Sequence, residues 1–187
     1  PGETVVIPPG TYHENVVITK PLTLIGEGFP VIDGGGHGDV VRIEADDVTL
    51  RGFVIRGSGR GVADEPAGIR ASGDRATIVG NRVVDVLYGI TLQGSGGHVV
   101  NDNHISSVTD FSAERRGHAI YLWYSDNNDI ERNVIVDAKD GLFLGFTSNT
   151  RLAGNDVSRV RYGIHYMYAN DNTFTGNRFH DSVAGAS

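Results

Sequence analysis

The stretch IERNVIVDAKDGLFLGFTSNTRLAGNDV, residues 130–157, holds one complete period of a repeat and the beginning of the next. Asn133 recurs as Asn155, 22 residues later, and each asparagine stands three residues after one apolar residue and two residues before another. Gly141 follows Asn133 by eight residues and opens the alternating segment GLFLG. A short fixed period built from apolar alternation indicates a solenoid.

The same period runs through most of the chain. The repeated asparagines are Asn81, Asn103, Asn133, Asn155 and Asn177, with spacings of 22, 30, 22 and 22 residues. Glycine follows eight residues after four of them, at Gly89, Gly141, Gly163 and Gly185. Residues 58–66 and 108–116 interrupt the period, and insertions into a solenoid form loops on one face. We interpret the asparagines as structural, because asparagine tolerates left-handed corners and its amide hydrogen-bonds along a stack of equivalent residues.

Apolar residues occupy matching positions after each glycine, in the alternation expected of strands. They are Ile90, Ile120, Leu142 and Ile164, followed two residues later by Leu92, Leu122, Leu144 and Tyr166. Stacking the repeats joins these positions into one interior. The sequence therefore predicts an all-β fold, a right-handed parallel β-helix with about 22 residues per coil and about seven coils. We expect residues 1–187 to form one domain that is cut from a longer chain at both ends, since a solenoid needs caps.

The composition argues against several classes of function. The formal net charge of the 187 residues is −7 and the positive charges are scattered, which disfavours nucleic acid as a partner. The sequence has no cysteine, so disulfides and thiolate metal sites are excluded. No apolar run approaches the roughly 20 residues that a transmembrane helix needs.

Residues that alternate with the predicted interior point outward, and in the later coils many of them are aromatic. The column before the glycine holds Tyr88, His118, Asp140 and Tyr162, and the two columns after it hold Thr91, Tyr121, Phe143 and His165, and then Gln93, Trp123, Gly145 and Met167. We define the aromatic face as Tyr121, Trp123, Phe143, Tyr162, His165 and Met167, with His118 and Asp140 beside them. A dense, exposed aromatic cluster of this kind marks a binding surface.

Three kinds of ligand suit the aromatic face. Aromatic rings stack on sugars, and aromatic and methionine side chains anchor protein partners. Histidine with methionine suits Cu(I), and histidine suits Cu(II). His165 and Met167 project the same way from one strand, whereas His118 lies two coils away, at least ~9 Å by strand spacing. His118, His165 and Met167 are therefore the candidate copper ligands, although this spacing keeps the three from sharing one ion without movement.

Two segments of the aromatic face resemble the NosD family. They are GHAIYLWYS at residues 117–125 and YGIHYMYAND at residues 162–171, of which the second is the more specific. PPGTY at residues 8–12, LTLIG at 22–26 and IDG at 32–34 also match, although such segments occur in many β-helix proteins. The resemblance covers nearly the whole chain, as the N-terminal and central part of a longer protein.

This resemblance implies a function that composition and spacing do not show. Members of the NosD family are periplasmic right-handed β-helices with carbohydrate-binding-type repeats, and they work with an ABC transporter through its membrane subunit. They are required for maturing the copper centre of nitrous-oxide reductase, with a copper chaperone lipoprotein as a further partner. The resemblance therefore implies a non-enzymatic accessory protein whose aromatic face docks partners or transfers copper.

Two other functions stay open. Many β-helices are polysaccharide lyases, hydrolases or epimerases, which need acid and base groups in a groove. The nearest acid sets, Asp46 with Asp47 and Asp137 with Asp140, are explained more simply as turn and corner residues. The acidic balance of the chain also disfavours a polyanionic substrate. A structural surface solenoid is the third interpretation, and it requires no function of the aromatic face.

Overall fold

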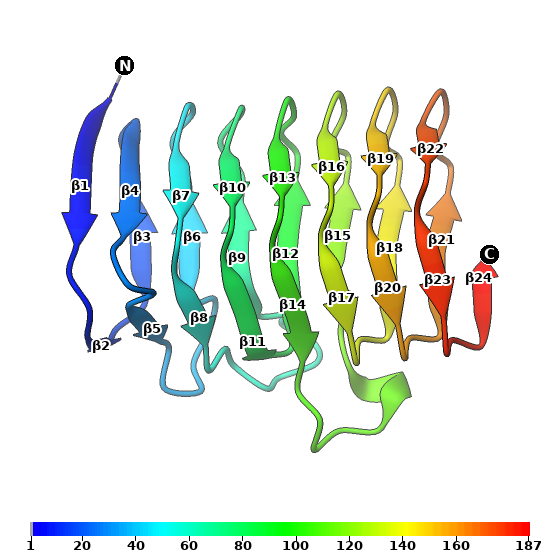
Figure 1. Cartoon of the computed structure of the whole chain (residues 1–187), viewed down its shortest axis with the longest axis horizontal. Coiled ribbons are helices and arrows are strands. Elements are labelled where there is room, and N and C mark those ends of the chain that lie inside the picture. Colours follow the sequence, from blue (N-terminus) through cyan, green and yellow to red (C-terminus); the bar gives the residue numbers. More distant parts are fainter. Residues whose placement is uncertain (1) are drawn as a thin grey trace.

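The chain winds into one parallel β-helix in the computed structural model, which describes residues 2–187 (Figure 1). Pro1, where the predicted domain begins, lies outside the described residues. In Figure 1 the near strands run downward, the far strands run upward, and the chain advances from left to right. This path is right-handed, as the sequence predicts.

Three parallel sheets form the walls of the β-helix, and each contains eight strands within residues 2–187. Sheet A comprises β1 (Glu3–Ile7), β4 (Leu22–Gly26), β7 (Thr49–Arg51), β10 (Thr77–Val79), β13 (Val99–Asn101), β16 (Asp129–Glu131), β19 (Arg151–Ala153) and β22 (Thr173–Thr175). Sheet B comprises β2 (Thr11–His13), β5 (Val31–Asp33), β8 (Val54–Arg56), β11 (Arg82–Val86), β14 (His104–Ser107), β17 (Val134–Val136), β20 (Asp156–Ser158) and β23 (Arg178–His180). Sheet C comprises β3 (Val16–Ile18), β6 (Val41–Ile43), β9 (Ala67–Ala71), β12 (Tyr88–Gln93), β15 (Ile120–Trp123), β18 (Asp140–Gly145), β21 (Tyr162–Met167) and β24 (Ala184–Ala186).

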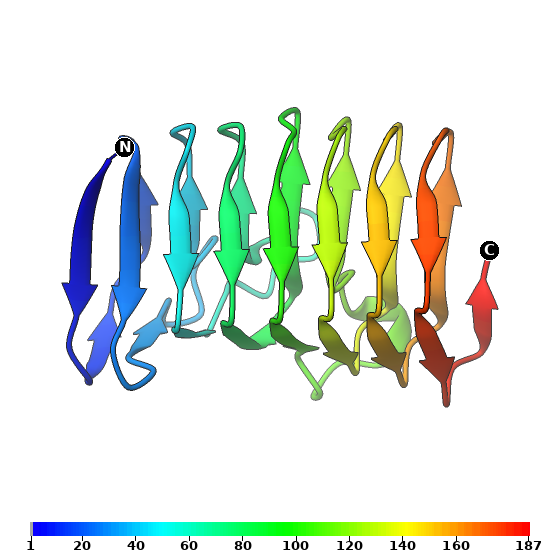
Figure 2. The ribbon, with the colours of Figure 1, turned by 45° about the horizontal axis from the view of Figure 1, so that its top comes forward.

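The described chain thus makes about eight turns, where the sequence indicated about seven. The period is irregular at the N-terminal end. Glu3 pairs with Leu22, so the first turn takes only 19 residues and does not show the 22-residue spacing. Figure 2 shows these first turns continuing the same stack as the regular ones.

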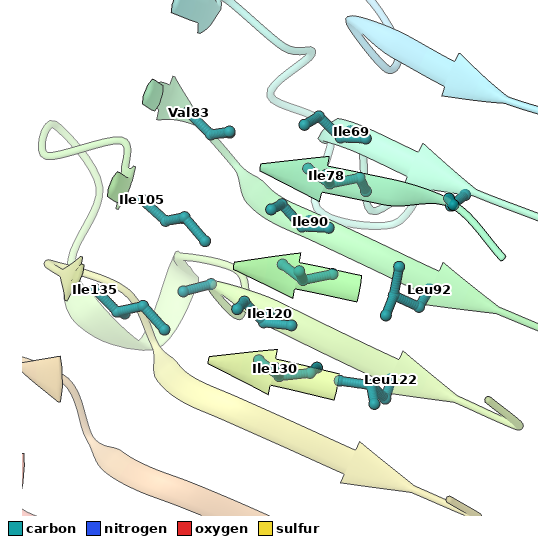
Figure 3. Packing of buried hydrophobic residues seen from close by; sticks show 14 of the residues in the cluster. Ile69, Ile78, Val83, Ile90, Leu92, Ile105, Ile120, Leu122, Ile130 and Ile135 are labelled. Atoms are coloured by element: carbon teal, nitrogen blue, oxygen red, sulfur yellow. The ribbon is translucent and has the colours of Figure 1, made fainter. Parts of the chain in front are cut away.

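The core is a set of apolar columns that run along the inside of the stack (Figure 3). Ile90, Ile120 and Leu142 pair in register in sheet C, and all three are fully buried, as predicted. Side chains from sheets A and B, such as Ile130 and Ile135, meet them from the other walls. Each inward residue is covered by its equivalents in the turns before and after, which explains why alternation over a few residues suffices to build the interior.

The repeated asparagines form a continuous hydrogen-bonded ladder at the corner between sheets A and B. The backbone N–H of Asn103 donates to Oδ1 of Asn133 at 3.0 Å, and Asn133 repeats this contact with Asn155 at 3.0 Å. Each side-chain amide also donates to a backbone carbonyl of an earlier turn, such as Nδ2 of Asn133 to Val100 O at 2.8 Å. The structural interpretation is therefore confirmed, because these bonds satisfy backbone groups that the corner would leave unpaired.

One part of that interpretation is wrong, because the asparagines themselves are not left-handed. The left-handed residue is the one before each asparagine, for example Arg132 with φ +50° and Gly154 with φ +62°. Asparagine therefore occupies this position because its amide forms the ladder hydrogen bonds inside a buried corner. The repeated glycines, which are the second residues of β12, β18, β21 and β24, also have a different role from a left-handed corner. A Cβ at Gly141 would lie 2.4 Å from a methyl carbon of Val157, so glycine is needed there for close packing.

Both insertions lie on one side of the stack, at the bottom of Figure 1, and they contact each other. Arg60 of the first insertion donates to Asp110 of the second at 2.7 Å and to Asp85 at 2.8 Å. The second insertion contains the short 3₁₀ helix η1 (Ala113–Arg115). Phe111 from this insertion and Tyr121 of the aromatic face pack against the same buried cluster, which comprises Ala67, Leu87, Tyr88 and Val108.

Candidate functional site

Strands β15, β18 and β21 carry the aromatic face on the outer side of sheet C. Tyr121 pairs in register with Phe143, and Phe143 with His165. Trp123 pairs in the same way with Gly145, and Gly145 with Met167. The predicted outward columns are therefore present in register.

Several members of the aromatic face are less exposed than the sequence predicted. Asp140 is fully buried, and His118 and Phe143 are nearly so, while Tyr121, Trp123, Tyr162 and His165 are partly exposed. Met167 is 37% exposed. The outward direction was correct, but large aromatic side chains on adjacent turns cover the shorter ones, which alternation alone cannot show. The face is therefore a second, outer packed layer around Asp140, with an exposed rim.

Asp140 is the centre of a buried charged cluster. Both of its carboxylate oxygens accept from Arg161, Oδ1 from Nε at 2.8 Å and Oδ2 from Nη2 at 2.7 Å. Oδ2 also lies 2.8 Å from Nδ1 of His165. Nδ1 of His118 is 3.2 Å from the same oxygen but is not aligned for a hydrogen bond, so this buried nitrogen has no partner. One carboxylate therefore hydrogen-bonds with Arg161 and His165 and lies against His118.

Burial and neighbouring charges set the protonation states of the side chains in this cluster. Burial raises the pKa of Asp140, but contacts with His118, Arg161 and His165 outweigh it, so the pKa of the carboxyl lies well below its usual range. Burial lowers the pKa of His118 despite the nearby carboxylate, which favours the neutral ring. The hydrogen bond to Asp140 raises the pKa of Arg161. Asp140 and Arg161 thus form a permanent ion pair with a neutral His118 against it.

The two histidines approach each other much more closely than strand spacing predicted. Both Nδ1 atoms contact the same oxygen of Asp140, at 3.2 Å for His118 and 2.8 Å for His165, so the expected separation of at least ~9 Å is wrong for these atoms. The rings lean toward Asp140 from turns on either side of it. The ring of Phe143 contacts both, with centroids 4.5 Å from His118 and 4.7 Å from His165.

The donor atoms left for a metal ion are therefore few. A carboxylate can only accept, so Nδ1 of His165 carries a proton, and Nε2 is the ring nitrogen left for a metal ion. The Met167 thioether projects from the same strand two residues later. Within residues 2–187, no group of three or more His, Cys, Asp or Glu side chains is arranged to hold a metal ion. A histidine nitrogen with a thioether suits Cu(I) best among biological metals.

Trp123 occupies space that a glycine leaves open. A Cβ at Gly145 would lie 2.5 Å from two carbon atoms of the Trp123 ring. The indole meets the Phe146 ring edge to face, with a centroid distance of 5.0 Å. Its position over the next turn is therefore set by Gly145 and by Phe146.

A second aromatic column was missed by the sequence analysis. Tyr124, Phe146 and Tyr168 stand one turn apart, with centroid distances of 4.6 Å and 5.1 Å and ring planes within 6° and 11° of parallel. All three have left-handed backbones, with φ of 49°, 50° and 49°. Tyr124 is 58% exposed and Tyr168 is 74% exposed. Their constant spacing of 22 residues was the signal that could have revealed them.

The likeness to solved structures supports the fold. The catalytic domain of a GH87 α-1,3-glucanase superposes with a TM-score of 0.79 at 14% identity, over 95% of this chain and 35% of that one. Identity this low shows the shared β-helix alone. No helix in the described part of the chain is long and apolar enough to cross a membrane.

Sequence comparison identifies the family. A probable ABC transporter binding protein NosD of Pseudomonas aeruginosa is 32% identical over 136 residues, which cover 71% of this chain and 31% of that protein. Its counterpart from Stutzerimonas stutzeri is 30% identical over 137 residues, with 72% and 31% covered. The chain thus spans about a third of the length of these relatives. The profile of the family described as "Periplasmic copper-binding protein (NosD)" matches residues 37–183, which include the whole aromatic face, and the chain belongs to the NosD family.

Proposed function

We propose that this chain is part of a periplasmic accessory protein of an ABC transporter. The accessory protein carries copper, or docks copper proteins, through its aromatic face. The observation that carries the proposal is the pair of His165 and Met167 on β21, with His165 oriented by the buried Asp140. A carboxylate that fixes the tautomer of a histidine is the usual second partner of a histidine that binds metal. The family description supports a periplasmic location and copper binding, and the names of the relatives support association with an ABC transporter.

Copper is cargo in this proposal. Nε2 of His165 and the thioether of Met167 hold Cu(I) at the rim of the face, where a partner can reach it. Two soft or borderline ligands without a third suit transient binding followed by transfer. His118 faces Asp140 from the other side of Phe143, and its part in copper binding stays a prediction.

The partners of this proposal follow the resemblance to NosD proteins. They are the membrane subunit of the ABC transporter, the copper chaperone lipoprotein that delivers the ion, and nitrous-oxide reductase, whose copper centre is assembled. The rim residues Tyr121, Trp123 and Tyr162 give these partners aromatic anchors around the copper ligands.

A polysaccharide-processing enzyme is the alternative, supported by the likeness to the α-1,3-glucanase fold. Glycoside hydrolysis needs a carboxyl group that carries a proton. Asp140, the fully buried carboxylate of the aromatic face, is instead kept ionised by Arg161. Asp140 is therefore unsuited to act as the acid of a glycoside hydrolase, and measurable product from polygalacturonate or alginate would favour the enzyme.

The copper proposal is tested by competition titration of Cu(I) against a chromophoric chelator. His165→Gln and Met167→Leu keep the side-chain size and remove the ligand atom, and His104→Ala on sheet B is the matched control because His104 is exposed and distant in register. Binding that each ligand variant weakens and the control does not supports copper transfer. No binding by the unaltered chain would refute it, and pull-downs with the transporter subunit, the chaperone and the reductase would then test docking alone.

A further inference from the structure

The turn between β12 and β13 lacks the side chains that its neighbours carry. Its sequence is Gly94, Ser95, Gly96 and Gly97, and Ser95 is buried. The equivalent turn one coil later holds Tyr124, Ser125, Asp126 and Asn127, since Gly94 N donates to Trp123 O and Gly97 N to Asp126 O. The outward columns of Tyr124, Asp126 and Asn127 therefore have no side chain in the coil before.

This gap is a pocket of about 380 Å³, which we call the glycine notch. The earlier coil forms one wall with Asp74 and Arg75, and the later coil forms the other with Tyr124, Asp126 and Asn127. The backbones of the two walls are two strand spacings apart, roughly 9.6 Å. After the thickness of the wall atoms is subtracted, a single ligand ring fits between them.

Tyr124 presents a full ring face to the glycine notch. Phe146 covers its other face at 4.6 Å, and the column of parallel rings ends at Tyr124 because Gly94 occupies the next place. Trp123 meets Tyr124 edge to face and leans over Gly145 in the later turn, so it leaves this face open. A ligand ring in the notch would continue the stack.

The polar groups of the walls are held in place and keep free hydrogen-bonding atoms. Oδ1 of Asp74 accepts from Gly96 N at 2.9 Å, and Oδ1 of Asp126 accepts from Ser148 N at 2.6 Å. Oδ2 of Asp74 lies 4.0 Å from Nη1 of Arg75, beyond hydrogen-bond distance, so each carboxylate can still accept through Oδ2 from a ligand. Arg75 is held by Asp47, with Nε 2.7 Å from Oδ1. The notch combines one apolar face with fixed acceptors at its edges.

We propose that the glycine notch binds one pyranose ring of a neutral glycan. The C–H face of the sugar stacks on Tyr124, and its hydroxyl groups donate to the Asp74 and Asp126 carboxylates and meet the Asn127 amide. The carboxylates repel a uronic acid. An apolar side chain as ligand would leave the two carboxylates desolvated without partners. A cationic ligand is disfavoured because Arg75 already places a positive charge on the wall opposite Tyr124. This site goes beyond the proposed function, since it shares no residue with the Asp140 cluster or with His165 and Met167.

The test uses a substitution that the fold already accommodates. Gly94→Tyr fills the notch, and the left-handed backbone of Gly94 (φ +65°) carries aromatic residues at the same place in the next three turns. A Cβ at Gly94 meets nothing within 4 Å. Gly80→Tyr is the matched control, because Gly80 (φ +64°) has equally open surroundings at another corner. Tyr124→Leu removes the ring face and leaves the notch empty.

The unaltered chain and the three variants are titrated by calorimetry with cellotetraose, maltotetraose and laminaritetraose, beside tetragalacturonate and N-acetylarginine amide. We expect at least one neutral oligosaccharide to bind with a Kd of about 1 mM or below, with a tenfold loss in Gly94→Tyr and Tyr124→Leu and no loss in Gly80→Tyr. The idea is overturned if none of the three neutral oligosaccharides binds, if Gly94→Tyr binds as well as the unaltered chain, or if the arginine probe is the preferred ligand. Cu(I) titration of the same variants keeps the two proposals separate, because their ligands differ.

Discussion

Nδ1 of His165 lies 2.8 Å from Oδ2 of Asp140, a fully buried carboxylate one turn earlier in the β-helix. Because the same carboxylate forms two hydrogen bonds with Arg161, it stays charged, and the histidine must keep its proton on Nδ1. A structural ion pair thereby determines which nitrogen of a partly exposed histidine is available to a ligand. The stability of the fold and the chemistry of the aromatic face depend on the same side chain.

Replacing Asp140 tests this dependence. Asp140→Asn keeps the size of the side chain but leaves the Arg161 cation without its charged partner, so we expect the free energy of unfolding to fall by about 3 kcal/mol. Urea unfolding followed by circular dichroism measures the change. Asp137→Asn is the control, because Asp137 forms the same two-point contact with Arg159 near the surface, at 2.9 and 2.7 Å, and solvent screens that pair. Equal losses in the two variants would contradict the special role of burial.

Acid should destabilise the protein through its buried histidines. Burial lowers the pKa of His98 to about 4, and Nδ1 of His98 accepts from Ala76 N at 3.1 Å, which only the neutral ring can do. Below a pH of about 6.5 the unfolded chain binds a proton at this site and the folded chain does not, so stability falls as the pH drops from about 6.5 to 4. The expected loss is on the order of 3 kcal/mol. Burial of His118 contributes in the same direction.

His98→Asn separates the titration from the fold. The equivalent place one coil later holds Asn128, whose Oδ1 accepts from His98 N at 3.0 Å, so asparagine fits this inward column. We expect the variant to fold and to lose less stability between pH 7 and pH 4 than the unaltered chain. The slope of the unfolding free energy against pH is the measurement, and an unchanged slope would show that His98 is not the group responsible.

Gly145 should be essential for the position of Trp123. In Gly145→Ala the new methyl group would overlap the indole ring, so the ring must move away from Phe146, at a cost of about 1–3 kcal/mol. Trp123 is the only tryptophan of the chain, and its fluorescence spectrum therefore reports the movement directly. Gly10→Ala is the control, because a Cβ there meets its nearest neighbour at an ordinary 3.5 Å. An unchanged emission spectrum in Gly145→Ala would contradict the close packing of the indole ring on Gly145.

The stack could be predicted from the sequence because equivalent residues of successive turns contact each other. An asparagine such as Asn133 needs an identical residue above and below it, so the ladder leaves a strict period in the sequence. The outward columns followed from alternation for the same reason. The first turn, of 19 residues, departs from that period, so strict periodicity does not give the number of turns.

The site was less predictable because side-chain length and direction decide it. Strand spacing placed His118 and His165 at least ~9 Å apart, but both side chains lean toward the short Asp140 between them. Periodicity gives the column of a residue, and it does not give the tilt of its side chain. The glycine notch arises in the opposite way, from side chains that Gly94 and its neighbours lack, so no chemical group marks it in the sequence.

The asparagine ladder should carry a large share of the stability at each corner. Asn133→Ala removes the acceptor of Asn103 N and the donor to Val100 O, and both groups are buried, so we expect a loss of roughly 3 kcal/mol. Asn149→Gly is the control, since Asn149 lies at an exposed left-handed corner (φ +54°) where glycine is well accommodated. Thermal and urea unfolding of the two variants measure the difference. If Asn133→Ala were as stable as the control, the ladder would be a consequence of the stacking rather than one of its causes.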